Sequence, residues 1–369
     1  MKRLIIATIL ITLIISCSNQ SKEIDIGLMG IYSGRYSEVG VATRNGVSLA
    51  IEKINQQGGL LGKKITFTPL DNKNEKNQVV ANFEQHISEG RKFIIGPNIS
   101  KLANETRMFA MREDILIISP TMSADIMADI DDNFIRVISR TSQEGHIIAK
   151  KALDMGLKRA AVVYDLSNAE YTEPIYEVFR ETFEKASGKI VYVNHVSNNI
   201  KEDFLDMAEN INSTQADTLF LLTTAIDAAS IAQQVRKTNT TIHFFGTRWA
   251  KTLDIISNGG QAVEGMILTS MYTPEKRSDK YISFEKDYQD KFGVKPSFIA
   301  AYAYEAVMLL AEGIKKAGST NVDKVKNALI NMQKFDGLEE TFTINKFGDS
   351  VRKSSTVQIK NGTFEVIDD

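Results

Sequence analysis

Cysteine is almost absent from this chain. A single one, Cys17, occurs in 369 residues, so no disulfide can form within the chain. A chain of this length can bury enough apolar surface to be stable without cross-links. The length also exceeds what one hydrophobic core usually organises, so we expect two domains.

An excess of positive charge is also lacking. The chain has 44 Lys and Arg against 46 Asp and Glu, and a formal net charge of −2. Because nucleic-acid binding requires a basic stripe or patch, we expect no nucleic acid partner. After the first residues, no apolar run reaches the roughly 20 residues that a membrane-spanning helix needs.

Catalytic and metal-binding patterns are missing as well. No Gly-x-Ser-x-Gly turn is present to expose a nucleophilic serine. The histidines do not have the spacing of metal ligands, and those at 195 and 243 fall in predicted strands, where we expect ordinary packing. The full set is His86, His146, His195 and His243. We therefore predict a protein that is not an enzyme and has no cofactor or metal.

The N-terminus is typical of an exported protein. Lys2 and Arg3 precede a run from Leu4 to Ile15 that is apolar apart from two threonines. This run has the length of a signal-peptide core. It ends in Ile-Ile-Ser-Cys, which resembles the lipobox of bacterial lipoproteins. The resemblance implies a signal peptide over residues 1–16, a lipid on Cys17 and a tether over residues 17–23. The alternatives are an ordinary secretory signal with a chance cysteine, or a failed membrane span.

The most informative stretch runs from residue 93 to 126. Two short apolar runs, Phe93–Ile95 and Ile115–Ile118, flank a segment with the apolar periodicity of a helix. Strand, helix, strand is the unit of a parallel sheet. Both strands end in small polar residues, Gly-Pro-Asn-Ile-Ser and Ser-Pro-Thr-Met-Ser. Ligands of open α/β sheets bind at this carboxyl edge.

Ser100 is the first candidate of this edge. It can hold a small anion together with the free N–H groups of the following helix. Alternatively, Ser100 only caps that helix, and Ser119-Pro120 is only a turn.

Five short motifs then fall in the order seen in type I periplasmic binding proteins. They are Ile26-Gly27, Ser33-Gly34 with Gly40, Ile54-Asn55 with Gly58-Gly59, Ile95-Gly96-Pro97 and Ile118-Ser119-Pro120. The similarity runs from about Ile24 to about Phe347 and is greatest to the leucine/isoleucine/valine-binding branch.

The resemblance implies a fold class and a division of the chain. We expect two Rossmann-like α/β lobes with parallel-sheet cores, joined by three crossings where the chain passes between lobes. The first lobe would comprise residues 24–140 with 273–344, and the second 141–272 with 345–369. The crossings would lie at residues 134–141, at Tyr272-Thr273-Pro274 and near Ile344.

The same resemblance implies a set of ligand-binding residues. From the first lobe, two hydroxyls and backbone groups would contact the ligand, and from the second lobe a tyrosine would cover it. Thr224 and Ala225 lie where the family carries another aromatic residue, so that wall would be missing here. The candidates are Tyr36, Ser100, Met122, Ser123, Tyr171, Thr224, Arg248 and Trp249.

Arg248 departs most from the family pattern. Amino-acid binders of this branch carry an acidic side chain there, which meets the ammonium of the ligand. A guanidinium would instead attract a carboxylate or carbonyl group, and Arg35 could add positive charge to the same opening. Alternatively, Arg248 points to solvent or pairs with Asp227, leaving Trp249 as the cleft residue.

The resemblance implies an extracytoplasmic, lipid-anchored protein that binds a small polar solute and delivers it to the permease of an ABC importer. The solute would be amino acid-like, or a carboxylate or amide without a free amine. The alternative is a sensor that signals to a membrane kinase or chemoreceptor, because a closed cleft serves either purpose.

Overall fold

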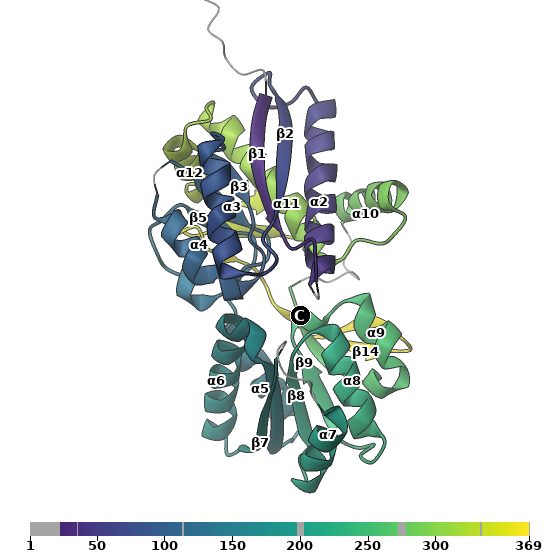
Figure 1. Cartoon of the computed structure of the whole chain (residues 1–369). Helices are drawn as coiled ribbons and strands as arrows, with labels where there is room; N and C mark the ends of the chain where they lie inside the picture. The colour runs from purple at the N-terminus through teal and green to yellow at the C-terminus, as the bar shows by residue number, and fades with distance from the viewer. Residues whose placement is uncertain are drawn as a thin grey trace, which may run out of the picture.

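A computed structural model describes residues 23–34, 36–112, 114–197, 203–271, 278–332 and 334–368. The chain forms two α/β lobes, one above the other in Figure 1. Each lobe has a largely parallel sheet covered by helices, which confirms the predicted fold class. The predicted signal peptide, tether, Cys17, Arg35 and second crossing at 272–274 lie outside the described residues.

The sheet of the first lobe has the strand order β2-β1-β3-β4-β5, and every pairing is parallel. Buried parallel strands carry continuous apolar runs because helices cover both faces, and Leu116–Ile118 in β4 is such a run. The strands are β1 (Glu23–Gly30), β2 (Lys64–Asp71), β3 (Phe93–Ile95), β4 (Leu116–Ser119) and β5 (Phe134–Arg136).

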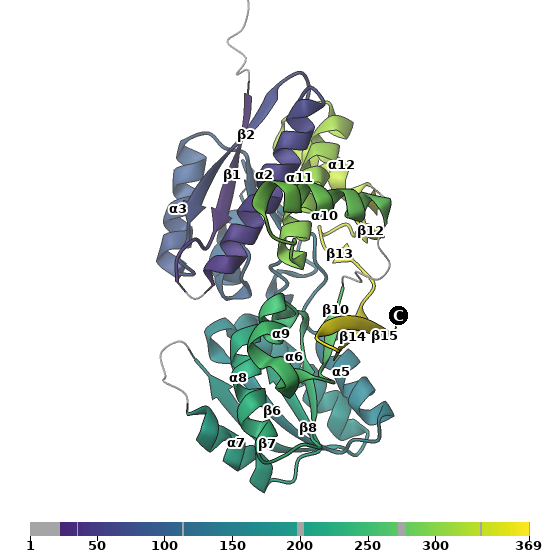
Figure 2. The same ribbon diagram turned by 90° about the vertical axis from the view of Figure 1, so that its right-hand side faces the viewer.

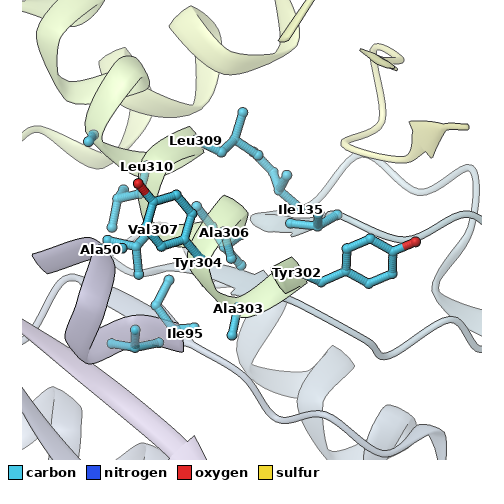
Figure 3. Packing of buried hydrophobic residues seen from close by; sticks show 14 of the residues in the cluster. Ala50, Ile95, Ile135, Tyr302, Ala303, Tyr304, Ala306, Val307, Leu309 and Leu310 are labelled. Carbon is cyan, nitrogen blue, oxygen red and sulfur yellow. The ribbon is translucent and has the colours of Figure 1, made fainter. Parts of the chain in front are cut away.

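Helix α11 is the centre of the first lobe's core. Its side chains pack with Ile95 and Ile135 of the sheet and with Ala50 of α2 (Figure 3). Gly46 allows α2 to approach α11 closely, since a Cβ there would lie 2.2 Å from the Ala300 carbonyl oxygen. The helices are α2 (Ser37–Gln56), α3 (Lys76–Ser88), α4 (Ala103–Ala110), α10 (Asp279–Phe292), α11 (Phe298–Ala317) and α12 (Val322–Ile330).

The sheet of the second lobe has the order β15-β14-β10-β9-β8-β6-β7. The pairings from β10 to β7 are parallel, whereas the tail adds β14 and β15 as an antiparallel hairpin. The strands are β6 (Arg159–Asp165), β7 (Lys189–Val196), β8 (Thr218–Leu222), β9 (His243–Gly246), β10 (Ile267–Ser270), β14 (Ser355–Lys360) and β15 (Thr363–Asp368).

Helices cover both faces of this second sheet (Figure 2). Short α9, like α12 in the first lobe, was not predicted. The helices are α5 (Gln143–Asp154), α6 (Ala169–Lys185), α7 (Phe204–Ser213), α8 (Ala225–Arg236) and α9 (Leu253–Gly259). Among the described helices, none combines the length and apolar character of a membrane span.

Two buried ion pairs lie where the chain passes between the lobes. Arg136 lies 2.6 Å from the Asp349 carboxylate. Arg352 pairs with Glu305 of α11, and its Nε donates to the Val137 carbonyl at 2.6 Å. These contacts connect the segment at Arg136 and Val137 with the segment from Asp349 to Arg352, and they connect Arg352 with α11 in the core of the first lobe.

We propose a position for the third crossing that is further along the chain than the expected one near Ile344. A small antiparallel sheet continues the first lobe to Val351 because β13 pairs with β12. We therefore propose that this crossing falls at residues 352–354 instead of near Ile344. The strands of the small sheet are β11 (Phe335–Asp336), β12 (Thr341–Ile344) and β13 (Ser350–Val351).

Candidate ligand-binding cleft

A cleft with a cavity volume of about 40 Å³ lies between the two lobes. Residues that follow the carboxyl ends of strands in both lobes, together with residues of α2, α6 and α11, form its walls. Those of the first lobe are Val39, Asn98, Ile99, Ser100, Thr121, Ser123, Ile138, Phe298 and Ile299, and those of the second are Asn168, Tyr171, Arg248 and Trp249.

Ser100 is positioned by the turn that follows β3. It is the first residue of the short 3-10 helix η1 (Ser100–Leu102), whose N-cap position is Ile99 and has no side-chain cap. Helix α4 begins after Leu102, again without a side-chain cap. The alternative in which Ser100 caps a helix is therefore wrong. Its side chain instead lines the cleft.

The turn after β4 places Ser123 in the same wall. The Ser119 hydroxyl donates to the Pro97 carbonyl at 2.5 Å and accepts the Met122 backbone N–H at 3.0 Å. The Thr141 hydroxyl lies 2.8 Å from the Ser123 carbonyl oxygen and 2.9 Å from Ser123 Oγ, and Ser123 lines the cleft. Met122 is fully buried in the core and is absent from the cleft lining.

Asn98 is a cleft residue that the sequence reasoning missed. Its side-chain N–H groups donate to Thr43 Oγ1 at 3.0 Å and Thr121 Oγ1 at 3.1 Å. Its Oδ1 is buried and accepts no hydrogen bond from the described residues. An orphaned buried acceptor is costly, so this oxygen is a site for a donor from a ligand or from water.

Aromatic rings close one side of the cleft. The Tyr171 ring meets Trp249 edge-on, with centroids 5.5 Å apart. Tyr36, from the first lobe, lies nearly parallel to Trp249 with centroids 6.3 Å apart, and its hydroxyl donates to Asp165 at 3.3 Å. Tyr36 thus lies beside the cleft and supports Trp249, which lines it.

Arg248 is buried and pairs with Glu144. Its NH1 lies 3.1 Å from Glu144 Oε1, and its backbone N–H donates to Glu144 Oε2, also at 3.1 Å. Both alternatives considered above, exposure to solvent and pairing with Asp227, are therefore wrong. Asp227 instead contacts Thr224, whose hydroxyl donates to the Asp227 carboxylate at 2.8 Å. Thr224 is also the N-cap of α8. Thr224 is absent from the cleft lining.

Tyr171 completes the network around Glu144. Its hydroxyl donates to Glu144 Oε1 at 2.8 Å. Burial raises the pKa of Tyr171 well above its usual value, and the neighbouring Glu144 carboxylate raises it further. The phenol consequently remains a donor throughout the physiological range.

The two walls already touch across the cleft. The Lys101 backbone N–H of the first lobe donates to Asn168 Oδ1 of the second at 2.9 Å, and the Tyr36–Asp165 bond also crosses. The arrangement is that of a closed form, in which a bound molecule is largely removed from water.

The histidines lie away from this cleft. His86 is buried in the first lobe, where burial and nearby Arg91 lower its pKa to about 4. His195 packs edge-on against Tyr164 at 4.4 Å, whereas His243 is exposed at the start of β9, so the predicted packing there is wrong. Within the described residues, no group of three or more acidic, histidine or cysteine side chains could hold a metal ion.

Two α/β lobes with a cleft between them are the arrangement seen in proteins that close on a small solute. The profile of the periplasmic binding protein family matches residues 23–363, and the chain belongs to this family.

Its relatives bind different small molecules. A Leu/Ile/Val-binding protein of Rhizobium johnstonii is 26% identical over 338 residues, covering 90% of each chain. The substrate-binding protein LivJ of Streptococcus pneumoniae, solved with isoleucine, has a TM-score of 0.85 at 23% identity and covers 94% of this chain and 100% of its own. A solute-binding protein of R. palustris, solved with benzoate, has a TM-score of 0.84 at 20% identity, with coverages of 94% and 96%. These relatives are named as binding proteins rather than enzymes.

Proposed function

We propose that this protein is an extracytoplasmic solute-binding lipoprotein that delivers a small polar solute to the permease of an ABC importer. The observation that carries the proposal is the interlobe cleft, whose walls present the Ser100 and Ser123 hydroxyls from one lobe and Arg248 from the other. The family relationship supports it, since the named relatives are solute-binding proteins of such transporters.

The solute is a carboxylate or amide of amino-acid size that lacks a free amine. No Asp or Glu is among the residues that line the cleft within the described part of the chain. An ammonium group enclosed there would lose its water without gaining a carboxylate partner, which is costly. The apolar remainder of the solute would lie against the side chains of Ile99, Phe298 and Trp249.

The solute itself provides the test. The purified protein should carry a stoichiometric small molecule, which unfolding releases for identification by mass spectrometry. Adding it back should raise the melting temperature in proportion to the logarithm of its concentration above Kd. Recovery of an unmodified amino acid with a free ammonium group would contradict the ligand class, and finding no bound or stabilising solute would contradict the function.

Cys17 is the proposed attachment point for a lipid. The lone thiol follows Ile-Ile-Ser at the end of the apolar N-terminal run, and one myristoyl-length chain gives only marginal anchoring, so more than one acyl chain is needed. Cys17→Ala should shift the protein from the membrane to the soluble fraction or block its processing. Normal cleavage of the variant with unchanged membrane association would contradict lipidation.

A further inference from the structure

Glu144 is a buried charge on which the second wall of the cleft is assembled. Glu144 lies in the first turn of α5, and its side chain is only 1% exposed. One carboxylate oxygen accepts the Tyr171 hydroxyl and faces the Arg248 guanidinium. The other accepts the Arg248 backbone N–H and the Thr269 hydroxyl. Donors from α6, β10 and the segment after β9 thus converge on one side chain.

The pairing changes what Arg248 offers to a solute. Arg248 is the only charged residue among the described residues that line the cleft, and Glu144 supplies an equal opposite charge 3.1 Å away. The other contacts of the guanidinium are with the Met271 sulfur and the Ser139 carbonyl, each at 3.4 Å. A guanidinium has five N–H donors, more than these contacts use. Arg248 can therefore still donate hydrogen bonds, but from a wall without excess positive charge.

The Glu144 carboxylate also acts on a charged solute. A solute carboxylate directed at Arg248 would meet Glu144 behind it, and like charges in a water-poor cleft repel strongly. A carbonyl oxygen would receive the same hydrogen bonds without that repulsion.

We propose that Glu144 determines specificity by neutralising Arg248, so that the second lobe selects an uncharged carbonyl or amide oxygen and rejects a carboxylate. The inference rests on the proposed function and deepens it. The solute then presents its anionic or most polar end to the hydroxyls of the first lobe. Its amide or carbonyl end faces Arg248. Glu144 is a positioning residue, because it acts through Arg248.

The test uses matched pairs of solutes that differ only in this charge. Each pair is a dicarboxylate and its monoamide, with aliphatic skeletons of increasing length or a benzene ring. Calorimetric titration of the purified protein gives the ratio of the two affinities. The wild type should prefer the monoamide by at least about tenfold. E144Q leaves Arg248 as an unbalanced cation and should shift the ratio toward the dicarboxylate by about tenfold or more.

A double variant separates charge from structural damage. E144Q/R248M removes both charges, a replacement that buried ion pairs often tolerate, and should restore the preference for the monoamide. Preference of the wild type for the dicarboxylate, or an equal ratio in wild type and E144Q, would overturn the inference. If E144Q does not fold, the wild type and the double variant decide, and dicarboxylate preference in either overturns it.

The two proposals fail in different ways. Binding by the wild type with no preference between the members of a pair contradicts the role of Glu144 alone. If neither member of any dicarboxylate and monoamide pair binds, the inference is overturned as well. The proposed function fails with it only if, in addition, unfolding releases no small molecule from the purified protein.

Discussion

At the scale of single residues, two similar hydroxyls illustrate the limit of sequence reasoning. Ser100 and Thr224 both precede helices, where either a cap or a ligand contact is plausible from the sequence. The structure gives them opposite roles. Thr224 accepts the Asp227 backbone N–H and caps α8, whereas Ser100 caps no helix and lines the cleft.

Removing each hydroxyl by substitution with alanine should separate the two roles. Ser100→Ala should reduce solute affinity by about 1.5–3 kcal/mol if the hydroxyl binds a charged solute group, with little change in stability. Thr224→Ala should lower the free energy of unfolding by about 0.5–2 kcal/mol, the usual effect of losing a cap, with affinity unchanged. Calorimetry and urea unfolding measure both quantities. Lost stability with intact binding in Ser100→Ala would contradict its ligand role.

The partner of Arg248 could not be found in the sequence. The positive charge of Arg248, where the family carries an acidic residue, was visible in the sequence. Its partner Glu144 was not, because it lies 104 positions away. A glutamate in the first turn of a helix is also ordinary, because it favours the helix N-terminus. Nothing local marks this carboxylate as buried. The orphaned oxygen of Asn98 was missed for the same reason, since hydrogen-bond satisfaction depends on Thr43 and Thr121.

At the scale of elements, most strands and helices were predictable because their apolar patterns are strong. The long α11 runs from Phe298 to Ala317, and buried apolar side chains recur along it. Short α9 and the two-residue strand β11 were missed, because such segments hold their shape through contacts with the rest of the fold.

The contact between α5 and α6 determines the geometry around Glu144. Gly145 lies beneath α6, and a Cβ there would be 2.2 Å from the Ile175 carbonyl oxygen and 2.8 Å from the Phe179 nitrogen. This close approach brings Tyr171, on α6, to the carboxylate on α5. The glycine is needed for its small size.

A methyl group at this position should force the helices apart. Gly145→Ala should lower the free energy of unfolding by about 1–3 kcal/mol, the usual cost of overpacking, and should weaken solute binding by displacing Tyr171. Lys150→Ala, at an exposed position of α5, is the control and should change stability by less than about 0.5 kcal/mol. Urea unfolding with calorimetry checks both. Unchanged stability in Gly145→Ala would contradict the tight contact.

At the scale of the whole molecule, a pair of carboxyl groups joins the lobes at the edge of the interface. Glu38 in the first turn of α2 shares a hydrogen bond with Asp254 in the first turn of α9. Two carboxyl groups can share such a bond only when one carries a proton. Loss of hydration at this contact and the Asp254 carboxylate raise the pKa of Glu38, an exposed residue, to about 7 from 4.5.

Closure should therefore depend on pH. A raised pKa means that the closed form binds the proton more tightly than the open form. The contribution of this pair is complete below about pH 4.5 and is lost as the pH rises through about 7. Solute affinity should accordingly decline from pH 5 to pH 8. Glu38→Gln keeps a donor at every pH and should flatten the decline. Identical pH profiles in wild type and variant would exclude the pair.

The central claim is that the two lobes enclose a solute beside Trp249. This residue is the only tryptophan in the chain, it lines the cleft, and Tyr36 and Tyr171 flank it. Its fluorescence therefore reports on the cleft alone. Titrating the solute released from the purified protein back into solute-free protein should change the emission and saturate at one molecule per chain. Ser100→Ala should require a higher concentration. Stoichiometric binding that leaves the emission of Trp249 unchanged would place the solute elsewhere and contradict the account.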